Sequence, residues 1–212
     1  MMIPIHELLW FALAAFLMVI SPGPNMIYLI SRSITQGKTA GLVSLVGVIC
    51  GFLFHIVLAG FGLTAILLAV PFAYGILKIS GAIYLLYLAY KAIKPNGKTF
   101  FEVNEHIAKD KPRKLLLMGF FTNLLNPKMA VFYLSFFPQF IKPEYGSILG
   151  QSMALGITQI SISFTINFII VMTAAKMASF LTRNPLWVRT QKWFMASVLT
   201  FLAIKMVLSK AK

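Results

Sequence analysis

Six apolar runs, each long enough to cross a lipid bilayer, constrain this chain more than any other feature. They cover approximately residues 8–31, 41–69, 72–93, 115–137, 148–175 and 186–208. A helix needs about 20 residues to span a hydrocarbon core of about 30 Å, whereas a membrane strand needs only about 10. Because lipid offers the backbone no hydrogen-bond partners, runs of this length must be helical. The sequence therefore predicts an all-α integral membrane protein with six transmembrane helices.

Composition and charge support a membrane environment. The chain is 59% hydrophobic and only 11% charged, whereas soluble domains are about 25% charged. Its net charge of +14 would suggest nucleic acid in a soluble protein. Here the basic residues gather between apolar runs, where such clusters set the orientation of a membrane protein. We therefore expect the lipid bilayer as a partner and no nucleic acid.

The distribution of basic residues predicts the topology. Thirteen of the nineteen Lys and Arg residues follow the first, third and fifth apolar runs. Positively charged loops stay in the cytoplasm, so both termini are expected on the outer side. We expect a single membrane domain over 1–212. It divides into a first repeat at about 1–95, a cytoplasmic loop at about 94–114 and a second repeat at about 115–212.

The first apolar run of each half contains one break. "SPGPN" occupies residues 21–25, and "NLLNPKMAVFYL" occupies residues 123–134. Proline removes a backbone donor and clashes with the preceding turn. The sequences Pro24-Asn25-Met26 and Pro127-Lys128-Met129 share Pro-x-Met at an offset of 103 residues. With three spans per half, the halves must be inverted, and inverted repeats with matching broken helices are typical of secondary transporters.

The breaks also predict a binding site for a zwitterion. The half-helix after Pro24 presents unpaired N–H groups and a positive dipole end to a carboxylate. The asparagine amide oxygens can accept from an ammonium group, and Lys128, deep in the fourth run, needs carbonyls, water or a substrate carboxylate. One break alone would favour a structural kink, but two matched breaks favour a site. The predicted substrate-binding residues here are Pro22, Gly23, Pro24, Asn25, Asn123, Asn126, Pro127 and Lys128.

Polar residues elsewhere in the runs extend the candidate site. Gln159, Ser163 and Asn167 are four residues apart and share one helix face, which predicts either a cavity lining or interhelical hydrogen bonds. His55 is either a proton-coupling residue or a hydrogen-bonded packing histidine. Gly47 and Gly51 predict a close helix contact, which also allows a homodimer.

Missing residue types narrow the function. None of the five acids lies inside an apolar run, and Cys50 is the single cysteine. Metal sites need carboxylates, thiolates or clustered imidazoles, so we expect neither a metal nor a cofactor. A lipid-modifying membrane enzyme would need an acid–base pair, so we expect no catalytic residues and no enzyme. A purely structural membrane protein would leave the matched breaks unexplained.

Three segments carry a resemblance to a known family. They are "SPGPNMIYLISRSITQGKTAGLVSLVGVICG", "LKISGAIYLLYLAYKAI" and "GFFTNLLNPKMAVFYLSFFPQFI". In this order the chain resembles the LysE/RhtB superfamily of bacterial amino-acid exporters over nearly its whole length. The resemblance implies a six-span carrier in the inner membrane, where the positive-inside count makes the expected termini periplasmic. It would export amino acids or related metabolites, such as homoserine, threonine or leucine, using the proton motive force. A passive channel for small zwitterionic solutes is the alternative.

Overall fold

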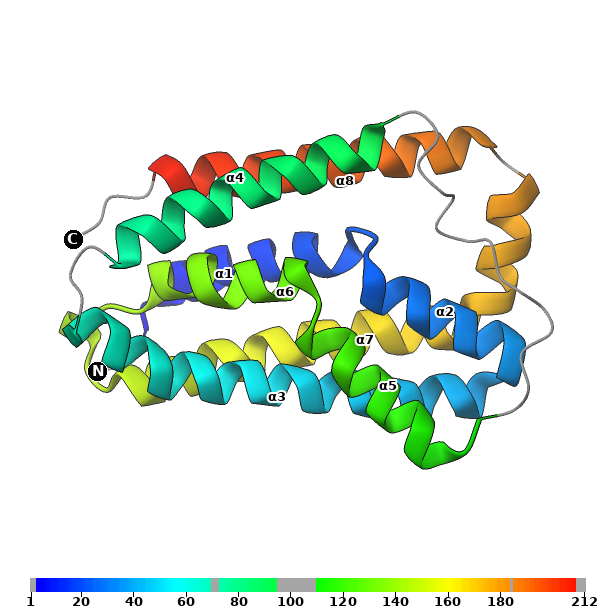
Figure 1. Ribbon diagram of the computed structural model, residues 1–212, viewed down its shortest axis with the longest axis horizontal. Coiled ribbons are helices and arrows are strands. Elements are labelled where there is room, and N and C mark those ends of the chain that lie inside the picture. The colour runs from blue at the N-terminus through cyan, green and yellow to red at the C-terminus, as the bar shows by residue number, and fades with distance from the viewer. Residues whose placement is uncertain (1–2, 70–72, 95–109, 184, 209–212) are drawn as a thin grey trace.

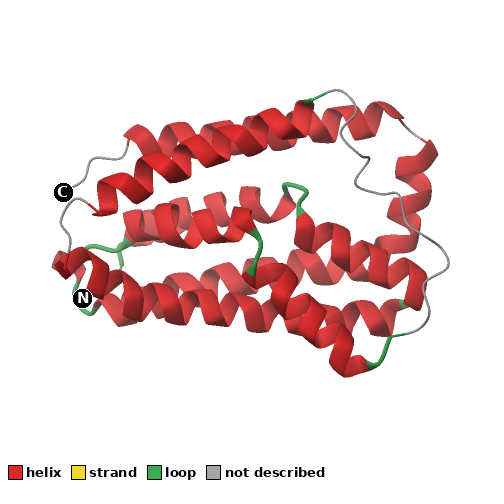
Figure 2. Cartoon of the chain, viewed as in Figure 1, coloured by secondary structure: helices red, strands yellow, loops and turns green. Residues whose placement is uncertain are grey.

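The computed structural model describes residues 3–69, 73–94, 110–183 and 185–208, and within these ranges the chain is helical without any strand (Figure 2). The all-α prediction is therefore confirmed. The α-helices are α1 (Ile5–Ile20), α2 (Pro24–Gln36), α3 (Lys38–Ala69), α4 (Ala73–Ile93), α5 (Pro112–Leu124), α6 (Pro127–Val131), α7 (Ile148–Arg183) and α8 (Pro185–Leu208). A π-helical turn, η1 (Phe132–Phe136), and two 3₁₀ turns, η2 (Phe137–Phe140) and η3 (Pro143–Tyr145), follow α6.

Apart from the two breaks, the described residues of the six apolar runs are helical. The runs differ in how fully each could cross a membrane. The segments Lys38–Phe61 and Ile148–Ala174 are long and apolar enough by themselves. Each bent pair of helices, α1 with α2 and α5 with the segment to Phe140, forms one further candidate. Shorter apolar stretches lie in α4 and α8. The described residues thus hold two to four candidate spans, and the count of six stays a prediction.

Both broken helices bend where the sequence places the prolines. The bend is 51° between α1 and α2, and 51° again between α5 and the segment Lys128–Phe140. Pro24 and Pro127 occupy the first turn of the helix that follows each break, a position where proline's missing N–H removes no intrahelical bond. The second break has its own cap, because Asn126 Oδ1 accepts from the backbone N–H of Lys128 at 3.0 Å.

The two halves are arranged in opposite directions (Figure 1). The first broken helix and the second run antiparallel along the long axis, as do α3 and α7, and α4 and α8. The helix contacts are consistent with this inversion. Helix α3 of the first half contacts α5 of the second, and α7 of the second half contacts α1 and α2 of the first. In addition, α3 contacts α7, and α4 contacts α8. The beginning of α1 and the end of α8 lie at the same end of the molecule. This arrangement is that of two inverted three-helix repeats.

Glycines hold α3 against α5 inside the chain. A Cβ atom at Gly47 would collide with the backbone carbonyl of Leu116, and one at Gly119 would collide with the carbonyl of Ser44. Gly51 lies against the side chain of Asn123. The predicted close helix contact is therefore made within one molecule, and these glycines give no support to a homodimer.

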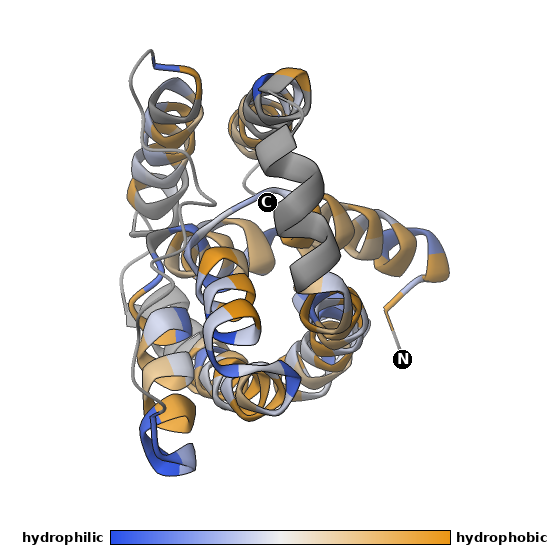
Figure 3. Ribbon diagram, turned by 90° about the vertical axis from the view of Figure 1, so that its right-hand side faces the viewer, coloured by the Kyte–Doolittle hydropathy of each residue, from blue (hydrophilic) through white to orange (hydrophobic). Residues whose placement is uncertain are grey.

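The outer faces of the bundle are apolar, as a surface in lipid requires. Exposed large side chains include Leu9, Leu53, Val57, Phe61, Ile83 and Leu134. Viewed along the long axis, apolar residues lie on the helices all around the bundle (Figure 3). Several buried polar side chains, among them Ser21, Asn25, Asn126 and Lys128, gather where the two breaks meet.

Gly47→Ala should destabilise the fold by about 1–3 kcal/mol, because the added methyl meets rigid backbone of α5. The expected measurement is a lower melting temperature of the purified protein in detergent. Gly75→Ala is the matched control, since nothing lies within 4 Å of a Cβ there. Equal melting temperatures for the two variants would contradict this packing.

Candidate functional site

The two breaks, about 100 residues apart in sequence, meet at one small buried cavity. Its free volume for water is about 20 Å³, room for roughly one water molecule. Residues from α1, α2, α3, α6 and α7 surround it. The lining residues are Met18, Val19, Ser21, Gly23, Asn25, Met26, Phe52, Asn126, Lys128, Met129, Ser163 and Asn167.

The ammonium group of Lys128 joins the two breaks. Its Nζ donates to the carbonyl oxygen of Met18 at 2.8 Å and to that of Ser21 at 2.6 Å. The Met18 carbonyl lies in the last turn of α1 and the Ser21 carbonyl directly follows that helix, where the break interrupts the intrahelical hydrogen bonds. Lys128 is 6% exposed. Of the three kinds of partner expected for this buried lysine, the structure shows carbonyl oxygens. A cation at a helix C-terminus also matches the helix dipole.

Gly23 gives the lysine its space. A Cβ atom at this position would lie 3.2 Å from Lys128 Nζ and 3.4 Å from its Cε. The backbone of Gly23 is extended, with φ of −169°, so any residue could adopt it. A side chain at this position would therefore have to displace the neighbouring ammonium group by a few tenths of an ångström.

Several polar atoms around the cavity are buried without a hydrogen-bond partner among the described residues. They are Ser21 Oγ, Asn25 Oδ1 and Asn126 Nδ2. Buried polar groups are normally satisfied, and each unsatisfied group costs about 1–3 kcal/mol. A bound polar molecule could therefore use the acceptor Asn25 Oδ1, the donor Asn126 Nδ2 and the Ser21 hydroxyl, which can donate or accept, next to the Lys128 ammonium group.

The polar stripe on α7 divides between two places. Ser163 and Asn167 line the cavity, and Asn167 Nδ2 donates to the carbonyl oxygen of Ser163 at 2.8 Å. Gln159 lies outside the cavity lining, where its Oε1 accepts from the hydroxyl of Tyr133 at 2.7 Å. The stripe therefore contains both a cavity wall and an interhelical hydrogen bond.

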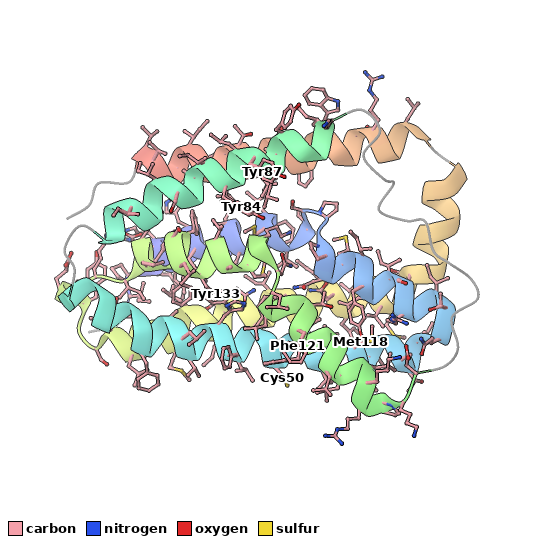
Figure 4. All side chains as sticks on the ribbon, in the orientation of Figure 1. Cys50, Tyr84, Tyr87, Met118, Phe121 and Tyr133 are labelled. Carbon is pink, nitrogen blue, oxygen red and sulfur yellow. The ribbon has the colours of Figure 1, made fainter. Side chains whose placement is uncertain are left out.

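A second polar cluster surrounds Tyr133 of η1, an element that packs against α3 (Figure 4). The His55 ring stacks on the Tyr133 ring, with centroids 5.0 Å apart and planes 4° apart. His55 Nε2 is 3.4 Å from the carbonyl oxygen of Asn123. The Asn123 amide is buried, and neither of its polar atoms has a partner among the described residues. His55 and Asn123 are thus together, but neither lines the cavity.

The remaining predicted residues lie around the cavity. Pro22 is buried beside it without lining it. Pro24 is exposed and borders a larger hollow of about 700 Å³ along α5, together with Asn126, Met118 and Phe121 (Figure 4). Pro127 follows directly after Asn126, and its side chain lies outside the described part. Since Asn126 borders both spaces, the hollow adjoins the cavity.

Sequence reasoning missed Ser21, Met18 and Phe52. Ser21 belongs to the SPGPN segment, and a serine directly before a broken turn was a usable signal. Met18 contributes a backbone carbonyl and Phe52 an apolar wall, for which the sequence carries no signal. Among the described residues no group of three or more His, Cys, Asp or Glu side chains gathers into a metal site.

Comparisons with known proteins point to a transport family. The model of the LysE type translocator family matches residues 15–210. The homoserine/homoserine lactone efflux protein of Salmonella typhimurium is 34% identical over 74% of this chain and 76% of its own length. Its Salmonella typhi counterpart is 34% identical over 86% of this chain and 85% of its own. An uncharacterized membrane protein of Vibrio cholerae is 29% identical over 98% of both. No solved structure matches this chain significantly.

Lys128→Met should destabilise the protein by about 1–3 kcal/mol, because it removes the partner of two buried carbonyl oxygens. A lower melting temperature in detergent is expected. Lys38→Met, at an exposed position at the start of α3, is the matched control. If both variants melt at the wild-type temperature, the hydrogen bonds from the ammonium group do not stabilise the first break.

Proposed function

Since this chain belongs to the LysE type translocator family, and is thus a membrane efflux transporter, we propose that it exports a small zwitterionic amino acid or related metabolite. Substrates of the homoserine, threonine or leucine kind would leave the bacterial cytoplasm across the inner membrane. The proton motive force would drive this export. The substrate would occupy the cavity between the two breaks.

The observation that supports this substrate class is the pairing of a cation with oxygen acceptors in one buried cavity. Lys128 offers a positive charge to a carboxylate. Ser21 Oγ and Asn25 Oδ1 are acceptors without partners among the described residues, so they suit an α-ammonium group. A zwitterion would satisfy both kinds of group at no net charge.

Two further points limit the substrate. The described lining of the cavity includes no Asp or Glu, so a second ammonium group, as in lysine, would lack a counter-charge. The Salmonella relatives are named for efflux of homoserine and homoserine lactone. A small amino acid with a hydroxyl or aliphatic side chain fits this combination best.

The size of the cavity favours a carrier over the alternative, a passive channel. Pockets that hold small ligands measure about 300–1,000 Å³, whereas this cavity has about 20 Å³ free for water. An amino acid can enter only if the broken helices move apart. Movement of one inverted repeat against the other around a fixed site is how transporters of this architecture alternate access.

The proposed function also includes the orientation of the protein in the membrane and the coupling of export to protons. The positive-inside count assigns the end of α2 and the beginning of α5 to the cytoplasm, with both termini periplasmic. His55 remains the candidate for proton coupling, since it is buried on α3 between Tyr133 and the carbonyl oxygen of Asn123. Ionisable groups at such depth in a membrane commonly take part in proton relays.

The test is efflux from cells preloaded with a mixture of labelled amino acids. Wild-type protein should accelerate the loss of one or a few of them. Asn25→Ala/Asn126→Ala should lower that rate by roughly 10-fold or more, because two hydrogen bonds to the substrate are lost. Thr158→Ala, which removes an exposed hydroxyl bonded within α7, is the matched control and should keep the wild-type rate.

Energy coupling separates the carrier from the channel. A carrier should move its substrate against a concentration gradient in inverted vesicles, and a protonophore should abolish this accumulation. Accumulation that never exceeds equilibrium would favour the passive channel. If no labelled amino acid leaves faster than in cells without the protein, the proposed substrate class is wrong.

A further inference from the structure

Two ion pairs join the ends of the broken helices. Lys142, which follows η2, donates to Glu7 Oε1 in the first turn of α1, with an N–O distance of 2.6 Å. At the opposite end of the molecule, Arg32 of α2 donates to Asp110 Oδ2, just before α5, at 2.9 Å. We call these the Glu7 pair and the Asp110 pair. Figure 1 shows that the helix ends concerned lie at opposite ends of the long axis.

The acids of the two pairs occupy matching positions in the two halves, whereas the bases Arg32 and Lys142 are 110 residues apart and match only in lying near the end of a broken helix. Glu7 and Asp110 are 103 residues apart, the same offset that relates Pro24 to Pro127. Each acid stands at the beginning of one broken helix, and each base stands at or after the end of the other. The beginning of each broken helix is therefore tied to the end of its partner.

The Asp110 pair is the more extensive one. Gln36 Nε2 donates to Asp110 Oδ2 at 2.8 Å, and the Asp110 backbone N–H donates to Gln36 Oε1 at 2.8 Å. Lys114 adds a second cation at 2.6 Å. Hydrogen bonds from Lys114 and Gln36, and the nearby charge of Arg32, hold the pKa of Asp110 below its usual value. Its carboxylate is thus ionised at neutral pH.

The Glu7 pair is also shielded from water. The side chains of Glu7 and Lys142 are 20% and 30% exposed, and those of Asp110 and Arg32 are 9% and 12% exposed. The hydrogen bond with Glu7 raises the pKa of Lys142 above its usual value. Water that enters when the helix ends part would solvate both charges, so the more exposed Glu7 pair opens at modest cost.

We propose that the Glu7 pair and the Asp110 pair are the two gates of the transporter, one on each membrane face. This inference rests on the proposed passage of a solute through the cavity between the breaks. With both pairs formed, the cavity is closed to an amino acid. Separation of Arg32 from Asp110 opens it to the cytoplasm, and separation of Lys142 from Glu7 opens it to the outside.

The test measures access to the cavity from each face without any substrate. Ser163→Cys in a Cys50→Ala background places one thiol on the cavity wall. A membrane-impermeant thiol reagent is then applied to right-side-out or inside-out vesicles. Arg32→Gln should speed labelling from the cytoplasmic face by roughly two- to fivefold, the population shift expected for a partly exposed ion pair. Lys142→Gln should do so from the outer face.

Matched controls remove a neighbouring charge that belongs to neither gate. Lys38→Gln lies close to Gln36 in sequence and Glu144→Gln lies close to Lys142, and both positions are exposed. Neither should change labelling from either face. The exchange Glu7→Lys/Lys142→Glu should restore slow labelling from the outside, which a general loss of structure would not permit.

The outcomes separate this inference from the proposed function. Labelling that rises from both faces in either variant would show that the pairs hold the fold together, and unchanged labelling would show that they close nothing. Either result would overturn the inference that the two ion pairs act as gates. Side-specific labelling in a protein that exports no labelled amino acid would keep the gates and reject the proposed substrate class.

Discussion

The hydrogen bonds from Lys128 to the carbonyl oxygens of Met18 and Ser21 are the interaction on which this structure depends. A broken helix leaves carbonyl groups unsatisfied in lipid, and a buried ammonium group lacks water, and each alone would cost several kcal/mol. Together they satisfy one another. A side chain from the second break thus satisfies the carbonyl groups of the first, which brings both breaks to one cavity. The Lys128 side chain also occupies the space next to Gly23.

The sequence predicted those parts of the fold and site that have a strong local cause. Proline located both breaks, apolar length located the helices, and helical spacing placed Ser163 and Asn167 on one face. It did not reveal which neighbour each polar group meets. Gln159 shares the face of Ser163 yet bonds to Tyr133, and the oxygens that accept from Lys128 belong to the backbone. Both depend on how α7 and the broken helices cross, which no short segment encodes.

The positions of the acidic residues also depend on whether a group of opposite charge is nearby. The described acids lie at helix ends, where Glu7 and Asp110 meet cations of the opposite repeat. The described lining of the cavity carries Lys128 as its one charged residue. The proposed zwitterionic substrate would suit this arrangement better than a purely cationic one, because the described lining offers it no acid. The absence of acids from the apolar runs and their presence at the helix ends thus belong to one electrostatic arrangement.

The dependence of the first break on Lys128 has a consequence for biosynthesis. The ammonium group lies 107 residues after Ser21, so at 5–20 residues per second the ribosome supplies it roughly 5–20 s later. During this interval the first repeat resides in the membrane with two carbonyl groups exposed. The nascent chain must shelter them with water, lipid head groups or the insertion machinery. The first repeat can therefore complete its folding only after the second repeat has been synthesised.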